Sequence, residues 1–346
     1  MIFIHTTLSM LLILHANAGT IVTKPQALPT LERVGVTTRE FADTARSNWL
    51  STGPRPLRVI IWYPSEVGGK EEQIQDPSQF SKPVSLLHDG KLSSSQKYPL
   101  IVLSHGSGGD ALQMRWIGYY LSSHGYIAVS VSHSGTAEEE RQTAPLTLSE
   151  YCMWERPQDI SAVLSNMLAD PFFSLRIDTN RIGAAGFSLG GATVIWSAGA
   201  RLDLEQLKKN APALPPFLQE PLKKVIEMTK NDPRVQQSTT HAGNSFKDER
   251  IKAVFALAPA IGYGFTAEGL KDIDIPVRIV VGDADVITPL ATNAKHYADH
   301  IAGATLTILP GELGHYTKEA SGNERGVELE QVSKLAFEFF EKTLVD

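Results

Sequence analysis

The sequence predicts an α/β fold in which a mostly parallel, twisted β-sheet carries helices on both faces. From Tyr98 onward, short apolar runs of strand length alternate with stretches of helical length, and this alternation is typical of βαβ units. Of the 346 residues, 42% are hydrophobic and 20% are charged, a composition that suits a globular domain with one sizeable core.

The first 18 residues differ from the rest of the chain. Ile2 to Leu14 is mostly apolar, and Ala16-Asn17-Ala18 follows it. This pattern predicts a secretory signal peptide at residues 1–18, cut after Ala18, and therefore export to the periplasm or the medium. The segment is too short for a comfortable membrane span. Because it has no Lys or Arg, a retained apolar anchor is the alternative.

The α/β domain is predicted to cover residues 19–346. Residues 33–38 and 57–63 are expected to be antiparallel edge strands. Residues 66–96 are rich in Ser, Gly, Glu, Lys and Pro and are expected to form a long surface loop. The alternation then predicts a strand at 100–103, a helix at 111–123, a strand at 126–131, a helix at 157–169 and a strand at 181–185.

Residues 202–248 interrupt this alternation. A charged stretch, a proline-rich stretch and a helical stretch at 220–230 follow one another there. We interpret the segment as a helical insertion, which either caps the carboxyl end of the sheet or lies at the periphery. Strands are expected again at 251–257, 277–281 and 305–309, and a closing helix at 327–344 has a core-facing stripe of Leu329, Val332, Leu335, Ala336, Phe339 and Phe340.

The strand at 181–185 leads into Gly186-Phe187-Ser188-Leu189-Gly190, and a helical stretch of small residues follows. Gly-x-Ser-x-Gly between a strand and a helix is the nucleophile elbow of α/β-hydrolases. The serine sits on a sharp, strained turn, and only glycine fits two residues before and after it. The pattern therefore predicts the α/β-hydrolase fold, with Ser188 as the nucleophile.

An acid and a histidine follow later strands in the order that this fold uses. Asp283 and Asp285 come after the strand at 277–281, and His315 comes after the strand at 305–309. In a Ser-His-Asp triad, histidine takes the serine proton near neutral pH and aspartate orients the imidazole. We predict Asp285 as the acid because it lies far enough past its strand to turn toward His315. Asp283 is the alternative, although it could instead hold the loop in an Asx-turn.

A glycine-rich segment follows the strand at 100–103. In Ser104-His105-Gly106-Ser107-Gly108-Gly109, the glycines allow backbone N–H groups to approach a substrate. We expect the N–H of Ser107 or Gly106 to form an oxyanion hole with the N–H of Leu189. One such donor stabilises the transition state by about 3–4 kcal/mol. His105 is expected to brace the loop through a hydrogen bond.

Several other classes of function are disfavoured. The net charge of −6 and the lack of a run rich in Lys or Arg argue against nucleic acid or an anionic membrane as a partner. The single cysteine, Cys152, excludes an intramolecular disulfide. His296 and His300 have zinc-ligand spacing on an expected helix, but no third ligand accompanies them. We therefore predict no metal and no organic cofactor; the sequence does not indicate the oligomeric state.

Four motifs together resemble a known family. They are His105-Gly106-Ser107-Gly108-Gly109, Arg156-Pro157-Gln158-Asp159-Ile160, Gly-Phe-Ser-Leu-Gly-Gly and Gly-Asp-Ala-Asp-Val-Ile-Thr-Pro. From about Leu57 to the last helix, the chain resembles the bacterial predicted dienelactone hydrolases, which are similar to platelet-activating-factor acetylhydrolases. The resemblance implies a serine esterase without a cofactor.

The chain departs from these groups at specific positions. True dienelactone hydrolases have a cysteine where Ser188 stands. The acetylhydrolases typically have His where Phe187 stands and Leu where Ser107 stands, so phospholipid specificity does not carry over. Cutinases usually carry a disulfide that one cysteine cannot form, which makes the similarity to them the weaker one.

We therefore predict an exported serine carboxylic-ester hydrolase that forms an acyl-enzyme on small or lipid-like esters. Alternatives are a platelet-activating-factor-type acetylhydrolase, a lipase or a thioesterase with the same triad. An alternative from another class is a catalytically silent α/β-hydrolase scaffold that only binds.

Overall fold

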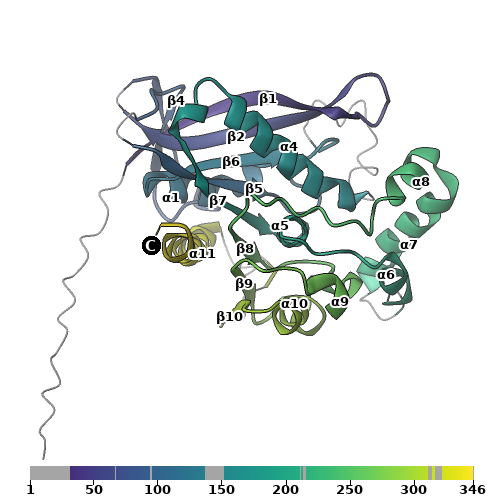
Figure 1. Cartoon of the computed structure of the whole chain (residues 1–346). Helices are drawn as coiled ribbons and strands as arrows, with labels where there is room; N and C mark the ends of the chain where they lie inside the picture. The colour runs from purple at the N-terminus through teal and green to yellow at the C-terminus, as the bar shows by residue number, and fades with distance from the viewer. Residues whose placement is uncertain are drawn as a thin grey trace, which may run out of the picture. The chain divides into compact units, whose positions relative to one another are not determined.

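The strands pair into one mixed sheet in the order β10-β9-β8-β7-β5-β6-β2-β1-β4-β3 (Figure 1). The computed structural model describes residues 32–66, 68–93, 96–136, 152–210, 212, 216–310, 314–315 and 322–345. The predicted signal peptide, residues 1–18, lies outside the described residues. The strands are β1 (Arg33–Ser47), β2 (Pro54–Ser65), β3 (Lys70–Ile74), β4 (Val84–His88), β5 (Tyr98–Ser104), β6 (Ile127–Ser132), β7 (Ile177–Phe187), β8 (Ala253–Leu257), β9 (Val277–Gly282) and β10 (Thr305–Leu309).

The six strands from β5 to β10 run parallel to one another, whereas β6 pairs with β2 in antiparallel orientation. Every residue of β5, β6 and β8 is buried, as expected of parallel strands covered on both faces. β7 lies between β5 and β8. The carboxyl ends of parallel strands meet at one edge of a sheet, so this order brings the segments after β5 and β7 together.

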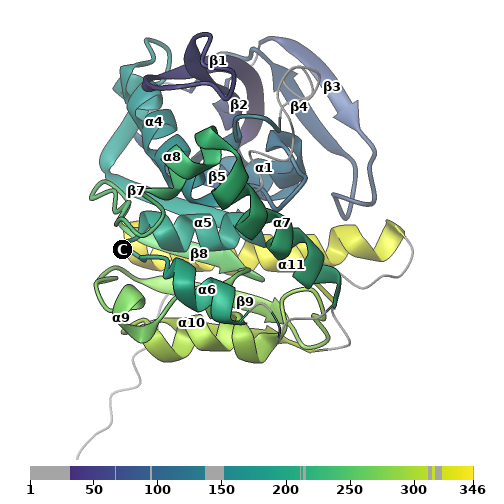
Figure 2. The same cartoon turned by 90° about the vertical axis from the view of Figure 1, so that its right-hand side faces the viewer.

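Helices cover both faces of the sheet (Figure 2). α1 packs against α11 and against β2 and β6, whereas α4 packs against α5 and against β1 and β5. This arrangement confirms the predicted α/β class. The helices are α1 (Arg115–Ser123), α4 (Arg156–Ala169), α5 (Leu189–Ser197), α6 (Leu204–Asn210), α7 (Pro216–Asn231), α8 (Pro233–Thr239), α9 (Ala267–Leu270), α10 (Ala294–His300) and α11 (Gly322–Phe340).

The predicted core stripe of the closing helix is confirmed, because Leu329, Val332, Ala336, Phe339 and Phe340 of α11 are buried, and Leu335 is partly buried against the core. None of the helices in the described part of the chain combines the length and the apolar character needed to cross a bilayer.

The amino-terminal strands differ from the prediction in two respects. β1 and β2 are not at the edge, because β4 and β3 extend the sheet beyond them. Residues 66–96 are not only a loop, since β3 and β4 lie within that range. β3 has the sequence Lys-Glu-Glu-Gln-Ile, and its first four residues are exposed. An exposed polar edge strand has no alternating apolar pattern, so its sequence resembles that of a loop.

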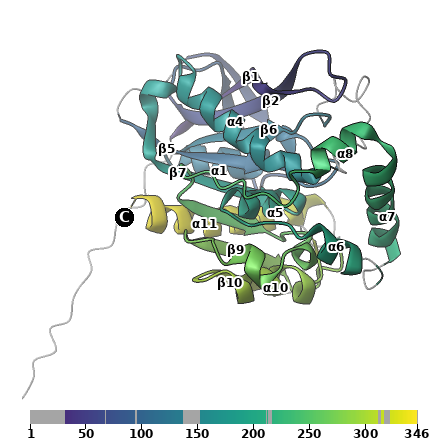
Figure 3. The same cartoon turned by 45° about the vertical axis from the view of Figure 1, so that its right-hand side comes forward.

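α6, α7 and α8 lie between α5 and β8 in the sequence. The helix expected at 220–230 falls within α7, which packs against α8 (Figure 3). Whether these helices cap the site stays a prediction.

Candidate active site

Ser188 lies on the turn between β7 and α5, as the Gly-x-Ser-x-Gly motif predicts. Its φ of 55° is in the region that non-glycine residues rarely adopt, at a cost of about 1–3 kcal/mol. The turn is fixed from the neighbouring strand. The Ser188 N–H donates to the Leu257 carbonyl at 2.9 Å, and the Ser188 carbonyl accepts from the Ala260 N–H at 3.0 Å.

The flanking glycines are required by close backbone contacts. A Cβ atom at Gly186 would collide with the carbonyl group of Gly190. A Cβ atom at Gly190 would collide with the carbonyl oxygen of Ser104 at the end of β5. Both collisions are with backbone, which cannot move aside cheaply. The start of α5 is therefore packed directly against the glycine-rich segment after β5.

Hydrogen bonds join Ser188, His315 and Asp285 in a chain. His315 Nε2 lies 2.8 Å from Ser188 Oγ, and His315 Nδ1 lies 2.9 Å from Asp285 Oδ2. An ionised carboxylate only accepts hydrogen bonds, so Nδ1 carries the proton and Nε2 can accept from the serine hydroxyl. The structure thus brings together the three side chains predicted as a triad, and their catalytic roles stay a prediction.

Asp285 is held by its own loop. Its Oδ1 accepts the backbone N–H groups of Ile287 at 2.9 Å and Thr288 at 2.8 Å. Burial alone would raise the pKa of this carboxyl, but the hydrogen bonds and charge of His315 and the bonds from Thr288 outweigh it, and the pKa lies below its usual value. Asp285 is therefore ionised at neutral pH. The alternative acid, Asp283, has an exposed side chain.

Thr288 is a site residue that the sequence analysis missed. Its hydroxyl donates to Asp285 Oδ2 at 2.6 Å and lies 3.2 Å from His315 Nδ1. The side chain is buried, so it fixes the same carboxylate oxygen that holds the imidazole. The sequence feature that could have identified Thr288 is its position three residues after a loop aspartate, because that spacing suits a side-chain hydrogen bond back to the aspartate.

The glycine-rich segment after β5 lies beside the elbow. The Gly106 N–H donates to the side-chain oxygen of Gln113 at 2.7 Å. Of the two donors that the sequence left open, the Gly106 N–H is thus already bonded to a side chain. Leu189 is the first residue of α5, where backbone N–H groups have no partner within the helix. The oxyanion role of Ser107 and Leu189 stays a prediction.

A second Ser-His-Asp chain lies beneath this segment. Ser104 Oγ is 2.9 Å from His133 Nε2, and His133 Nδ1 is 2.9 Å from Asp159 Oδ2. All three residues are fully buried, at 0% exposure, so no substrate reaches Ser104. Arg55 also donates to Asp159, at 2.7 Å. The arrangement is therefore a structural polar cluster rather than a second catalytic site.

Burial and the charges of this cluster strongly shift the pKa values of His133 and Asp159. Burial, together with the charge of Arg156, lowers the pKa of His133 to about 3. Burial would raise the pKa of Asp159, but Arg55, Arg46 and the hydrogen bond from His133 bring it well below its usual value. His133 is therefore neutral and Asp159 is ionised in the folded protein.

This pair predicts acid sensitivity. We expect the free energy of unfolding to fall by about 2 kcal/mol between pH 7.5 and pH 5 because of His133 alone. The unfolded imidazole takes up a proton near pH 6.5, whereas in the folded state the pKa is about 3. The stability from this group is full above the unfolded pKa and is lost as the pH falls toward the folded one.

Urea unfolding of the native protein and of His133→Asn at about pH 7.5, 6.5 and 5 measures this effect. Asparagine keeps an N–H toward Asp159 but takes up no proton, so the variant should be less stable at neutral pH and lose less stability on acidification. An equal loss in both proteins would contradict the assignment.

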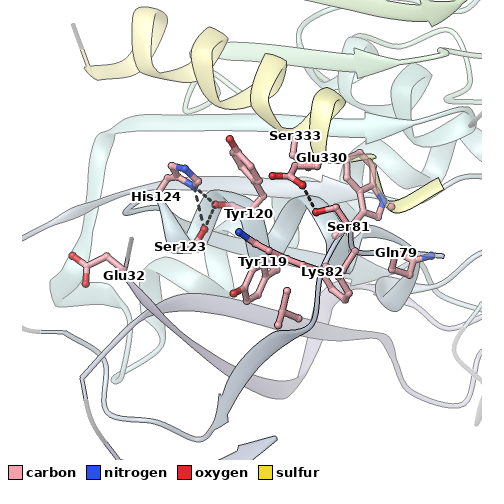
Figure 4. Close-up of a pocket in the computed structure, with 14 residues that line it drawn as sticks. Glu32, Gln79, Ser81, Lys82, Tyr119, Tyr120, Ser123, His124, Glu330 and Ser333 are labelled. Carbon is pink, nitrogen blue, oxygen red and sulfur yellow. Dashed lines mark hydrogen bonds between the residues drawn. The ribbon is translucent and has the colours of Figure 1, made fainter. Parts of the chain in front are cut away.

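Aromatic residues near the motifs divide into core and pocket. Trp154 and Trp196 are fully buried. Tyr119 and Tyr120 line a pocket of about 200 Å³ between α1, α11 and residues 79–84 (Figure 4). Ser81 donates a hydrogen bond to Glu330 there. Ser188, Asp285 and His315 do not line this pocket.

The histidine pair considered for zinc is engaged in other contacts. His296 Nε2 lies 2.7 Å from the carbonyl of Phe265, and His300 Nδ1 lies 2.8 Å from the carbonyl of His296. Within the described ranges, no three His, Cys, Asp or Glu side chains are grouped to hold a metal ion.

Comparisons with known proteins find esterases. A family model described as platelet-activating factor acetylhydrolase, isoform II, matches residues 78–143. Cutinase est1 of Thermobifida alba is 27% identical over 210 residues, which are 60% of this chain and 49% of the cutinase. The platelet-activating factor acetylhydrolase of Cavia porcellus is 28% identical in an alignment of 183 positions that covers 39% of this chain and 42% of that protein.

The chain thus spans about half the length of these curated relatives. The cutinase match is longer, whereas the acetylhydrolase match is slightly more identical and agrees with the matching family model, so these comparisons do not rank the two similarities. Among solved structures, a ferulic acid esterase from Streptomyces cinnamoneus aligns with a TM-score of 0.55 at 18% identity, over 94% of this chain and 92% of that chain.

The structural match over almost the full length confirms the α/β-hydrolase fold. Together with the family model and the curated relatives, it supports the α/β-hydrolase serine esterase group as the class of this chain.

Proposed function

We propose that the chain is a serine carboxylic-ester hydrolase that uses Ser188, His315 and Asp285 as a catalytic triad. The observation that carries this proposal is the hydrogen-bonded chain from Ser188 Oγ through both ring nitrogens of His315 to Asp285, at 2.8 and 2.9 Å. A serine hydroxyl is a weak nucleophile and requires a base at hydrogen-bond distance. The curated relatives are named as cutinases and an acetylhydrolase, which supports an ester as substrate.

The reaction follows from this arrangement. Ser188 Oγ attacks the ester carbonyl carbon while its proton passes to His315 Nε2, and Asp285 stabilises the imidazolium through Nδ1. The tetrahedral intermediate collapses, the alcohol takes the proton from Nε2, and the acyl group stays on Ser188. Water then attacks the acyl carbon by the same route, which releases the acid and restores the serine.

The negative charge that develops on the carbonyl oxygen needs donors on the other side of Ser188. The N–H of Leu189 belongs to the start of α5, where the helix dipole also favours negative charge. The N–H of Ser107 is proposed as the second donor, because the Gly106 N–H is engaged with Gln113.

Two apolar side chains beside the acid support an apolar group on the substrate. Val286 is 67% exposed and Ile287 is 38% exposed, and both follow Asp285 directly. Large apolar side chains in such positions suit contact with an acyl chain or an apolar alcohol. We therefore propose that the substrates are small or lipid-like esters. Narrower alternatives for the enzyme are an acetylhydrolase of the platelet-activating-factor type, a lipase or a thioesterase.

Export through residues 1–18 and the likeness to dienelactone hydrolases also stay proposals.

Labelling with a fluorophosphonate tests the proposal. The folded protein should gain one covalent adduct, which peptide mass spectrometry should locate on Ser188, because only a serine activated by a base reacts at a useful rate. Protein unfolded in urea should gain none. Hydrolysis of 4-nitrophenyl acetate should cease in step with labelling. A folded protein without an adduct on Ser188 would instead favour a silent binding scaffold.

A further inference from the structure

Two carbonyl groups of the segment after β5 accept hydrogen bonds from buried side chains. The His105 carbonyl accepts from Arg156 Nη2 at 2.9 Å. The Gly106 carbonyl accepts from His105 Nδ1 at 2.7 Å and from the Gly109 N–H at 3.3 Å. His105 is 0% exposed and Arg156 is 2% exposed, so water does not compete for these bonds.

Because the peptide bond is planar, these hydrogen bonds to the carbonyl groups also fix the direction of the N–H groups that follow them. In a trans peptide the C=O and the following N–H point in opposite directions within one plane. A Gly106 carbonyl that points at the His105 ring therefore directs the Ser107 N–H away from it. In the preceding peptide, the His105 carbonyl points to Arg156, and the Gly106 N–H on the opposite side reaches Gln113 at 2.7 Å. Ser107 itself is exposed.

The His105 ring is fixed at both nitrogens. Nε2 accepts the backbone N–H of His133 at 3.3 Å, so Nδ1 is the nitrogen that carries the proton. Arg156 Nη2 also lies 3.0 Å from Nδ1, which packs the guanidinium against the ring. Arg156 is the first residue of α4, and His133 directly follows β6. The ring is thus held by two elements that lie outside the elbow.

We propose that His105 and Arg156 are positioning residues that orient the Ser107 N–H toward the oxyanion of the substrate. This inference rests on the proposed esterase function. Neither side chain touches the substrate; both act through the two peptide planes at Gly106. A donor that is displaced by about 1 Å loses most of its value in the transition state, at a cost of about tenfold to a hundredfold in rate.

Arg156→Lys and Arg55→Lys form a matched pair for the test. Both arginines are buried at 2% exposure in the same cluster, but Arg55 donates to Asp159 whereas Arg156 donates to the His105 carbonyl. Both substitutions should lower the urea midpoint. Only Arg156→Lys should lower kcat on 4-nitrophenyl acetate, by about tenfold to a hundredfold with KM nearly unchanged. The proposal would be overturned if both variants lost kcat equally, or if neither variant lost kcat.

A second pair at His105 keeps the proposal testable if Arg156→Lys does not fold. His105→Asn keeps an N–H near the position of Nδ1, whereas His105→Leu has a similar volume and no donor. We expect kcat to be at least tenfold higher in His105→Asn than in His105→Leu. A trifluoromethyl ketone, which forms a tetrahedral oxyanion, should bind more weakly to His105→Leu by the same factor. Equal kcat values and equal ketone affinities would contradict the positioning role.

The native protein separates failure of this inference from failure of the proposed function. If native protein hydrolyses the ester and gains the Ser188 adduct, unchanged kinetics in the variants reject only the positioning role. If native protein does neither, the esterase proposal itself fails.

Discussion

Replacement of Ser188 by alanine is expected to lower kcat on 4-nitrophenyl acetate by about 10⁵-fold to 10⁶-fold. Alanine has no oxygen to form the acyl-enzyme, so only residual catalysis from the oxyanion donors would remain. The backbone bonds that fix the elbow, to Leu257 and Ala260, are kept in the variant. Initial rates measured with purified protein, at enzyme concentrations high enough to detect the remaining activity, give the loss of kcat.

Ser197→Ala is the matched control for Ser188→Ala. Ser197 is buried at the end of α5, the helix that follows Ser188, and its hydroxyl donates to the Thr193 carbonyl at 3.1 Å. We expect this variant to lose a little stability and to keep its kcat. Substantial activity in Ser188→Ala at a normal urea midpoint would assign the nucleophile to another residue.

Asp285→Asn is expected to lower kcat by about 10³-fold to 10⁴-fold. The carboxylate accepts from His315 Nδ1 at 2.9 Å and from Thr288 Oγ1 at 2.6 Å. An amide can turn its NH₂ group toward His315, which favours the tautomer with the proton on Nε2. That tautomer cannot accept the proton of Ser188. The loss should appear in kcat and in the rate of fluorophosphonate labelling alike.

Asp283→Asn tests the choice between the two aspartates. Asp283 has an exposed side chain, and its backbone N–H donates to the Leu309 carbonyl at 3.0 Å, a bond that asparagine keeps. We expect kcat to change by less than about threefold, as for most exposed substitutions. A larger loss in Asp283→Asn than in Asp285→Asn would move the acid to Asp283.

The central part of the fold could be predicted because its sequence pattern has one physical cause. β5 to β9 are parallel and mostly buried, so their sequences are short apolar runs between helical stretches. β3 and β4 could not be found in this way. β3 exposes Lys70 to Gln73 and is defined by its pairing with β4, and a pairing partner leaves no signal in local composition.

Only part of the candidate site could likewise be predicted from the sequence. Ser188, Asp285 and His315 could be nominated because each follows a predicted strand and because their order is specific to one fold. Thr288 was missed because its role depends on the direction in which the loop after β9 turns. The bond from Arg156 to the His105 carbonyl joins residues 51 positions apart. No spacing rule connects such a pair, and burial of a charged side chain is visible only in three dimensions.

The distance along the chain between Ser188 and its proposed base, His315, has a consequence for biosynthesis. The bond from Ser188 to His315 spans 127 positions, and His315 follows β10, which pairs with β9. A chain made from its amino end exposes the elbow long before the imidazole leaves the ribosome. During that interval the serine has no base. If the proposed triad is correct, the nascent protein would be unable to cleave esters or to be acylated on Ser188 until His315 had been synthesised and β10 had paired with β9.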